Sequence, residues 1–287
     1  MTAAYVIHAP WPYSHRSAGV RALYILAGQL QQAGRRVAIS PLPSPWQPEE
    51  PPIELSLTST WPETVVRDAV HVYPDIVKGN PAGADRVVRW QLGRKRFPAE
   101  PGDVEFAWAP EVCPRPAHRL VVDVIEPELF FEKSSPGSGT LWWFGKERGA
   151  IPTLGIRRFT RGWRWRLMMN VGRFRGTRIT QTWPATRREL AIALRAADVL
   201  VSLDSFSALN GEATLCGTPV LLVGDAARQP PPDTIFGERG VVRSPKHLDR
   251  ARAEIPEAIA HYEALRSEIS GDVENFMKIC EQHFSEI

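Results

Sequence analysis

Two nearly continuous apolar runs, residues 199–203 and 220–223, frame the most regular pattern in the chain. Runs of this length and composition predict strands that are buried on both faces, as in a parallel sheet. Between them a polar loop, 204–210, leads into a short predicted helix, 211–216. Ligands of open α/β sheets bind beside the carboxyl ends of the strands, so this loop is the first candidate site.

The same alternation of strands and helices extends along the rest of the chain. Strands are predicted at 5–9, 37–39, 69–73, 105–109, 120–125, 141–144 and 178–183, and helices at 20–33, 184–196, 255–269 and 273–284. A block at 74–90 is expected to turn at Gly79 to Gly83 and then enter a helix. Thr186 and Glu189 form a predicted capping box, which makes both residues structural. This order of elements predicts an α/β protein.

The domain organisation follows from length and from one linker. With 287 residues the chain exceeds what a single hydrophobic core usually serves, so we expect two domains. Residues 132–140 are rich in Ser, Gly and Pro, which is typical of a hinge between domains. We therefore predict an N-terminal domain at 1–135 and a C-terminal domain at 136–270, followed by a last helix at 271–287.

Composition narrows the function classes. Hydrophobic residues make up 43% and charged residues 23%, as in ordinary globular proteins. No apolar run reaches the roughly 20 residues that a membrane span needs, and we find no secretion signal. The three cysteines lie far apart, without metal-ligand spacing. We expect a cytoplasmic protein without a metal site, and we find no P-loop, nucleophile elbow or DNA-reading motif.

The polar loop carries two acids, Asp204 and Glu212, with small hydrogen-bonding residues between them. These are Ser205, Ser207, Asn210 and Gly211. Beside a helix N-terminus they suit hydroxyl and phosphate groups, and Glu212 could accept hydrogen bonds from a vicinal diol such as ribose. The alternative is that Glu212, placed in the first helical turn, only complements the helix dipole. Spacing alone leaves both interpretations open.

The stretch D-S-F-S-A-L-N-G-E-A-T-L-C-G-T-P-V resembles the donor-site motif of GT-B glycosyltransferases. It is most similar to the retaining group, in which seven residues separate two acids. The resemblance implies that Glu212 holds the nucleotide ribose, that Asp204 lies near the transferred sugar, and that the backbone from Ser205 to Gly211, including Phe206, binds the donor phosphates. Asp204 stands where Glu is usual and Ser207 where Gly is frequent, which leaves the role of Asp204 open.

Three further positions acquire roles from this resemblance. Gly145 and Lys146 end a strand where GT-B enzymes place a basic ligand of the diphosphate; the alternative is a solvated lysine. Ser17, Ala18 and Gly19 resemble the small-residue turn before the first helix, on the acceptor side, with acceptor contacts expected from 8–20 and 41–60. His15 is a candidate base for the acceptor hydroxyl, unless it is only a solvated loop residue.

Residues 157–178 hold eight arginines and no acid, with Trp163 and Trp165 interleaved. Three interpretations stay open. The stretch could be a helix that packs its apolar side on the sheet, a surface helix that touches an anionic membrane, or a nucleic-acid contact. The overall interpretation includes no nucleic-acid partner.

The resemblance implies a GT-B fold: two Rossmann-like domains that face a cleft, with the last helix crossing back to the first domain. It implies transfer of a sugar from a nucleotide sugar to a glycan or lipid-linked acceptor, with retention, in the synthesis of a bacterial surface polysaccharide or glycolipid. No cofactor is expected. Membrane contact through 157–178 would place the protein at the inner face of the membrane. Two alternatives stay open: a sugar-nucleotide epimerase of the same fold, and a non-catalytic protein that binds a sugar nucleotide.

Overall fold

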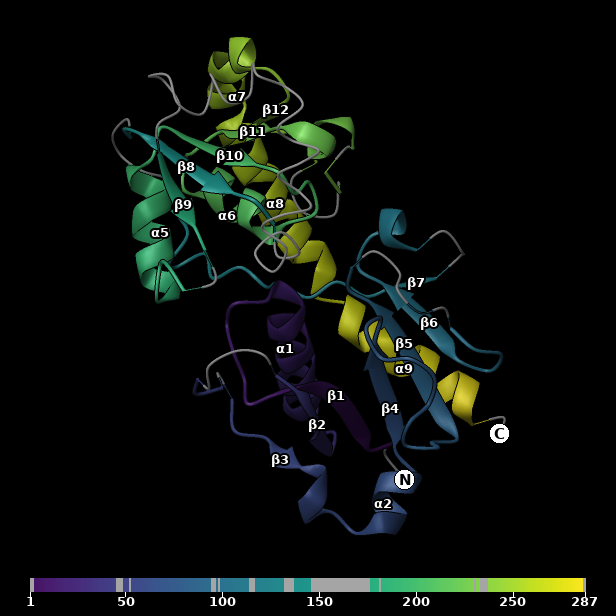
Figure 1. Ribbon diagram of the computed structural model, residues 1–287. Helices are drawn as coiled ribbons and strands as arrows, with labels where there is room; N and C mark the ends of the chain where they lie inside the picture. Colours follow the sequence, from purple (N-terminus) through teal and green to yellow (C-terminus); the bar gives the residue numbers. More distant parts are fainter. Residues whose placement is uncertain are drawn as a thin grey trace. The chain divides into compact units, whose positions relative to one another are not determined.

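The chain is divided into two compact units in the computed structural model (Figure 1), which describes residues 3–44, 49–51, 53–93, 97, 99–113, 117–131, 137–145, 176–180, 182–229, 231–232 and 237–285. Unit 1 comprises residues 1–124 and 266–287, and unit 2 comprises residues 125–265. The sequence had suggested boundaries at 135 and 270. Residues 125–131 belong to unit 2 because helix α5 (Arg187–Ala196) holds them: Arg187 binds Glu126, and Arg195 donates to the Leu129 carbonyl at 2.5 Å.

Within the described residues, unit 1 contains a seven-stranded parallel sheet of order β3-β2-β1-β4-β5-β6-β7. The strands are β1 (Tyr5–Trp11), β2 (Val37–Pro43), β3 (Ser56–Leu57), β4 (Val70–Pro74), β5 (Arg86–Gln91), β6 (Val104–Ala107) and β7 (His118–Arg119). The block after β4 was predicted to enter a helix, and this is wrong. Residues 75–85 form a loop that leads directly into β5, which pairs with β4 in parallel. Residues 120–125 likewise form no strand.

One face of this sheet is covered by two helices, α1 (Ala18–Gln32) and α9 (Asp272–Phe284). Alternate residues of β1, Tyr5, Ile7 and Ala9, enter this apolar core. From α9 the core receives Phe276, whose ring lies 5.8 Å from that of Tyr5. The short helix α2 (Glu63–Arg67) precedes β4, and 3-10 turns occupy Thr58–Thr60 and Pro110–Val112. Helix α9, the last described helix of the chain, is therefore part of unit 1.

The opposite face of the same sheet carries buried polar side chains. Arg89 of β5 is 1% exposed and donates to Asp103 at 2.9 Å and to the Val77 carbonyl at 3.0 Å. It also donates to the Gly79 carbonyl, and its guanidinium lies over the Tyr73 ring. Arg89 thus fastens the loop of residues 75–85 across the sheet.

Two buried histidines lie beside this loop on neighbouring strands. His71 Nε2 donates to the Val66 carbonyl at 2.8 Å, so its Nδ1 can accept a hydrogen bond from His8 Nε2 at 3.0 Å. The His8 ring stacks on Tyr73 at 3.9 Å between centroids. Burial, followed by the neighbouring His71 and Arg89, lowers the pKa of His8 from 6.5 to about 3. Both rings are therefore neutral in the folded protein at pH 7.

Acidification should destabilise unit 1 through this pair. The pKa of His8 is lower in the folded than in the unfolded protein. Below pH 6.5 the unfolded state therefore binds a proton that the folded state does not bind until the pH approaches 3, and the free energy of unfolding falls over this range. Between pH 7 and pH 5 the free energy of unfolding should drop by about 2 kcal/mol from His8 alone, at 1.36 kcal/mol per pKa unit. Urea denaturation at several pH values measures this. A His8→Phe variant, which keeps the stack on Tyr73, should show a shallower pH dependence; an unchanged dependence would contradict the assignment.

Unit 2 contains a five-stranded parallel sheet, again within the described residues, of order β12-β11-β10-β8-β9. The strands are β8 (Thr140–Trp143), β9 (Gly176–Ile179), β10 (Val199–Ser202), β11 (Val220–Leu222) and β12 (Val241–Val242). The helices are α5, α6 (Ala208–Leu215), α7 (Leu248–Ala253) and α8 (Ile255–Ile269), with 3-10 turns at Gly224–Arg228 and Pro245–His247. The chain returns to unit 1 within α8, between Leu265 and Arg266.

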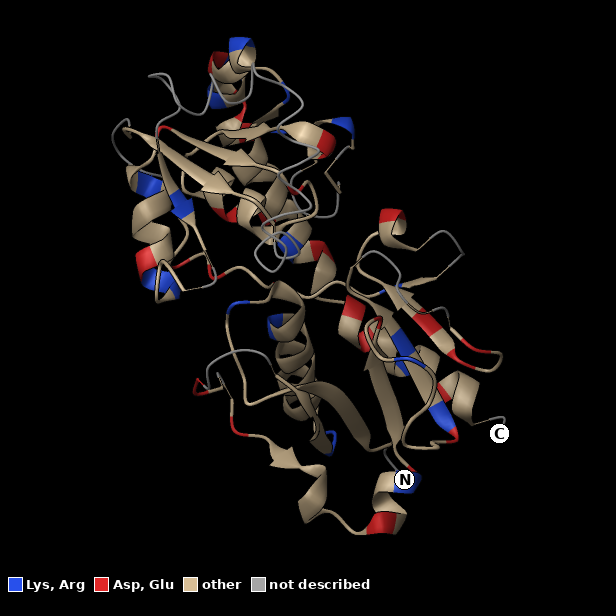
Figure 2. Ribbon diagram, in the orientation of Figure 1, with Lys and Arg blue, Asp and Glu red and all other residues tan. Residues whose placement is uncertain are grey.

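Two parallel sheets, each with helices and loops joining successive strands, fit two Rossmann-like domains. Strands β1, β4, β8 and β10 contain no Lys, Arg, Asp or Glu (Figure 2), as expected for strands covered on both faces, whereas the equally central β5 carries Arg86 and Arg89. Across the described ranges, no helix combines the length and the apolar character needed to cross a membrane. The arginine-rich stretch lies outside the described residues up to residue 175, so its membrane contact stays a prediction.

Candidate functional site

In each sheet the strand order reverses once. In unit 2 the chain goes from β8 outward to β9, then returns to β10 on the other side of β8 and continues through β11 to β12. The carboxyl ends of β8 and β10 are therefore adjacent at a topological switch point, where ligands of such sheets bind. The Leu203 N–H, just beyond β10, donates to the Trp143 carbonyl at 2.9 Å. Gly145 follows one of these strand ends and Asp204 the other.

The structure brings these two predicted residues together. Gly145 has a φ of +80°, in the left-handed region that favours glycine. A Cβ atom at this position would lie 3.4 Å from the Asp204 Cβ and 3.5 Å from its Oδ2. The backbone of Gly145 therefore lies against the Asp204 side chain. Lys146, the next predicted residue, lies outside the described residues.

The loop after β10 is held by its own polar groups. Asp204 Oδ1 accepts the Phe206 N–H at 3.1 Å, and the Asp204 carbonyl accepts Asn210 Nδ2 at 2.7 Å. Two further polar atoms of this loop and helix, Ser205 Oγ and Asn210 Oδ1, are buried and have no hydrogen-bond partner within the described part of the chain. Such groups carry a desolvation penalty of about 1–3 kcal/mol each. Hydrogen bonds to a bound ligand would remove this penalty.

Helix α6 begins earlier than the sequence suggested. It was predicted to start at Gly211, but it spans Ala208–Leu215, and Ser207 is its N-cap, accepting the Leu209 N–H at 3.3 Å. Serine is a preferred N-cap residue, and with Ser207 in this role the helix begins three residues before the predicted start. Glu212 is therefore the fifth residue of α6 and not part of its first turn. The alternative role for Glu212, as a simple complement to the helix dipole, loses its basis because that effect is confined to the first turn.

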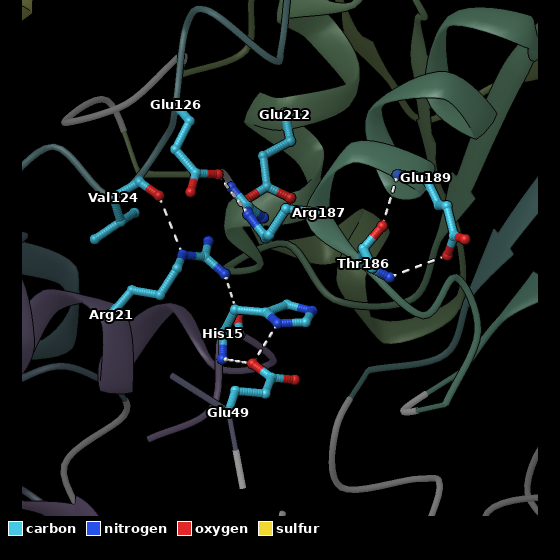
Figure 3. A network of polar contacts seen from close by, with 9 residues as sticks. All are labelled: His15, Arg21, Glu49, Val124, Glu126, Thr186, Arg187, Glu189 and Glu212. Carbon is cyan, nitrogen blue, oxygen red and sulfur yellow. Dashed lines mark hydrogen bonds and ion pairs between the residues drawn. The ribbon is translucent and has the colours of Figure 1, made fainter. Parts of the chain in front are cut away.

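Glu212 instead forms a buried ion pair. Its side chain is 3% exposed, and its Oε1 accepts Arg187 Nη1 at 2.7 Å (Figure 3). Arg187 Nε donates to Glu126 Oε2, also at 2.7 Å, and the guanidinium lies 4.4 Å from the centroid of the Phe130 ring. Burial alone would lower the pKa of Arg187, but the two carboxylates, Glu212 foremost, raise it above its usual value. The guanidinium is therefore charged.

Sequence reasoning missed Arg187, although a local signal was present. The predicted capping box is confirmed: Thr186 Oγ1 accepts the Glu189 N–H, and the Glu189 carboxylate accepts the Thr186 N–H at 3.1 Å. Arg187 is consequently the first residue of α5, where a positive charge opposes the helix dipole. An arginine in this position suggests a carboxylate partner outside the helix.

Unit 1 has its own switch point, between β1 and β4, because the chain runs outward from β1 through β2 and from β4 through β5. The loop after β1 leads into α1, with Ser17 as N-cap and Ala18 as the first helical residue. A Cβ on Gly19 would lie 3.8 Å from the Leu92 Cβ, so the start of α1 lies beside the end of β5. The predicted acceptor-side residues Ser17, Ala18 and Gly19 thus lie at the carboxyl edge of this sheet.

His15, in the same loop, has a carboxylate partner that the sequence did not indicate. Both its backbone N–H, at 2.8 Å, and its ring Nδ1 contact Glu49 Oε2 (Figure 3). Arg21 Nη1 donates to the His15 carbonyl at 2.6 Å and fixes the loop. Since an ionised carboxylate only accepts hydrogen bonds, Nδ1 carries the hydrogen and Nε2 is the proton-accepting atom of the neutral ring. This is the arrangement of an oriented general base.

Among the residues that the structure describes, no group of three or more His, Cys, Asp and Glu side chains is placed to hold a metal ion. The expected independence of metal stays a prediction. The predicted site residues that the structure describes fall into two sets. The donor-side set belongs to unit 2: Gly145, Asp204, Ser205, Phe206, Ser207, Asn210, Gly211 and Glu212. The acceptor-side set belongs to unit 1: His15, Ser17, Ala18 and Gly19. Each set lies on loops and helix starts that follow strand ends at a switch point.

Comparisons with known proteins give matches only among solved structures. No protein-family model matches the chain, and no curated protein matches its sequence. An α-glucosyltransferase in complex with UDP and a 13-mer DNA containing an HMU base aligns over 99% of this chain and 96% of its own, with 11% identity and a TM-score of 0.46. A second structure, α-glucosyltransferase (AGT) in complex with UDP, aligns over 98% and 95%, with 11% identity and a TM-score of 0.42. Because both TM-scores lie below 0.5, neither likeness assigns a function to any residue of this chain.

Proposed function

We propose that the chain is a nucleotide-sugar-dependent glycosyltransferase of the GT-B type. The observation that carries the proposal is the pairing of Gly145 with Asp204 at the switch point of unit 2, beside the start of α6. A glycine backbone, a serine and asparagine with unpartnered polar atoms, and a helix N-terminus together suit the phosphates and hydroxyls of a nucleotide sugar. The ribose would lie at Glu212 and the diphosphate at residues 205–211, with Lys146 as its basic ligand.

In the proposed reaction the bond between the anomeric carbon and the diphosphate oxygen breaks, and its electron pair stays on the diphosphate. A new bond forms to the acceptor hydroxyl oxygen, whose proton passes to the leaving diphosphate in a retaining reaction or to His15 Nε2 in an inverting one. The acceptor, a glycan or lipid-linked sugar, would bind at the carboxyl edge of the unit 1 sheet, near Ser17 to Gly19. Lys146 would offset the charge that develops on the leaving diphosphate.

The proposal allows two stereochemical courses, retention or inversion of the anomeric configuration. The two-acid motif supports retention. The contact of His15 with Glu49 favours inversion, because an inverting enzyme needs a base to take the acceptor proton. The anomeric configuration of the product, determined by NMR, decides between the two.

A nucleotide-binding experiment tests the donor site. We expect one nucleoside diphosphate, from UDP, GDP, ADP, CDP and dTDP, to raise the melting temperature, since a ligand at 100 times its Kd stabilises the folded state by about 2.7 kcal/mol. Gly145→Ala should weaken this binding. Gly83→Ala is the matched control, because Gly83 also has a left-handed φ, of +60°, yet has no atom within 4 Å of its Cβ position.

The same titration can contradict the proposal. Failure of every nucleotide to bind would do so, as would equal affinity of the Gly145→Ala and Gly83→Ala variants. Turnover then separates the alternatives: a new epimer from the donor alone indicates an epimerase, and binding without turnover over an acceptor panel indicates a binding protein. Transfer that persists in EDTA would support independence of metal.

A further inference from the structure

One nitrogen of the Arg187 guanidinium has no partner among the residues that the structure describes. Nε and Nη1 donate to Glu126 and Glu212, whereas Nη2 is buried and meets no hydrogen-bond acceptor there. Arg187 is 7% exposed, so its guanidinium is largely shielded from bulk water. A buried unpartnered donor destabilises the protein, and more so when it is charged. Arg187 Nη2 can therefore donate a further hydrogen bond beside Glu212.

This position lies on the ligand-binding side of the unit 2 sheet. Helix α5 follows β9 and α6 follows β10, so both helices start at the carboxyl edge. Arg187 is the first residue of α5 and Glu212 lies one turn into α6. One turn further along both helices, Cys216 Sγ contacts the Ala191 carbonyl at 3.9 Å, so the two helices run in the same direction. The ion pair joins them at the end where they begin.

The charges around Nη2 select the chemistry of its partner. Arg187 contributes one formal positive charge, and Glu126 and Glu212 contribute two negative charges. This surplus of negative charge disfavours a phosphate. A neutral hydroxyl suits the position, because its oxygen can accept from Nη2 while its hydrogen is donated to a carboxylate oxygen.

We propose that Arg187 is a specificity-determining residue for ribose: its Nη2 donates to the hydroxyl oxygen whose hydrogen is donated to Glu212. The inference rests on the proposed function and refines it. The donor is a ribonucleotide sugar, and deoxyribonucleotides are discriminated against, because they would leave Nη2 buried and unpartnered. A site built to bind a hydroxyl rejects the analogue that lacks it far more strongly than an apolar pocket does.

The test compares the ribonucleoside diphosphate that binds best with its 2′-deoxy and 3′-deoxy analogues, using calorimetry. The full-length protein should prefer the ribonucleotide by about 10- to 100-fold over at least one analogue, as expected for a charge-assisted hydrogen bond. In Arg187→Lys the preference should shrink to about threefold or less, because lysine keeps the charge but not the planar fork.

Arg195→Lys is the matched control. Arg195 also belongs to α5 and also holds the segment 125–131, through the Leu129 carbonyl and the Phe131 ring, but no described contact joins it to Glu212. It should keep the full preference for the ribonucleotide. If Arg187→Lys does not fold, the double variant Arg187→Met with Glu212→Leu replaces the pair by apolar residues of similar size. This variant should bind the ribonucleotide and deoxynucleotides equally.

The outcomes are distinguishable. A wild-type protein that binds nucleoside diphosphates without preferring ribose overturns the inference and leaves the proposed function intact. So does a preference that survives in Arg187→Lys or is lost equally in Arg195→Lys. If no nucleoside diphosphate binds, both the proposed function and the inference fail.

Discussion

Replacing Arg89 by methionine should lower the free energy of unfolding of the protein by about 3–5 kcal/mol, the usual effect of removing one partner from a buried ion pair. Methionine keeps much of the volume but leaves the Asp103 carboxylate, whose side chain is 8% exposed, without its cation. The Val77 and Gly79 carbonyls also lose their donor. Urea denaturation followed by circular dichroism measures the loss.

Arg86→Met provides the control for this variant. Arg86 belongs to the same strand, but its contact with the Asp68 carbonyl is exposed. Its removal should change the free energy of unfolding by no more than about 1 kcal/mol, as is typical of surface interactions. Similar losses in the two variants would show that Arg89 does not fasten the loop of residues 75–85.

If transfer inverts the anomeric centre, His15→Gln should reduce acceptor-dependent sugar transfer by about 10²- to 10⁴-fold, the range attributed to general acid–base catalysis. Glutamine can keep a hydrogen bond to Glu49 but cannot take a proton from the acceptor hydroxyl. The nucleotide affinity should not change, because the residues proposed to bind the donor belong to unit 2. Initial rates at saturating donor, together with a calorimetric Kd for the nucleotide, separate the two effects.

Glu49→Gln should show an intermediate loss, because the imidazole then lacks the carboxylate that orients Nδ1. His118→Gln is the matched control, since His118 is an exposed residue of β7 in the same unit. Transfer that continues at the normal rate in His15→Gln would remove His15 from the mechanism. It would also leave retention, as implied by the two-acid motif, as the favoured course.

Sequence patterns predicted the central strands of both sheets because burial on two faces leaves a strong local signal. The apolar runs at 199–203 and 220–223 correspond to β10 and β11, and the strand–helix–strand order at the start of the chain corresponds to β1, α1 and β2. The capping box of α5 was equally visible, because all of its contacts lie within four residues. Helix α6 was placed correctly, but its start was missed because Ser207 was assigned to the loop.

Strand β5 was misjudged because of its charges. Arg86 and Arg89 interrupt the apolar pattern of Val87, Val88 and Trp90, so the segment resembles an amphipathic helix. The charge of Arg89 is buried only because Asp103 and two loop carbonyls surround it. No local pattern indicates that such partners exist, and tertiary contacts therefore override the sequence signal.

The candidate site residues that were missed, Glu49 and Arg187, share one property: each is in contact with residues far from it in the chain. Glu49 lies 34 residues from His15, and Arg187 lies 61 residues from Glu126 and 25 from Glu212. Motif spacing identifies residues within one loop, such as Asp204 to Glu212. It cannot identify a partner that only the folded sheet brings near, although the unfavourable position of Arg187 in its helix was a usable clue.

The return of the chain to unit 1 has a consequence for synthesis on the ribosome. Helix α9 supplies Val273, Phe276, Cys280 and Phe284 to the core beneath the first sheet, yet it is translated after all of unit 2. Unit 2 can therefore complete its fold on the nascent chain, whereas the N-terminal sheet keeps part of its apolar face uncovered until α9 emerges. We therefore expect unit 2 to finish folding before unit 1, opposite to the usual order from the N-terminus onward.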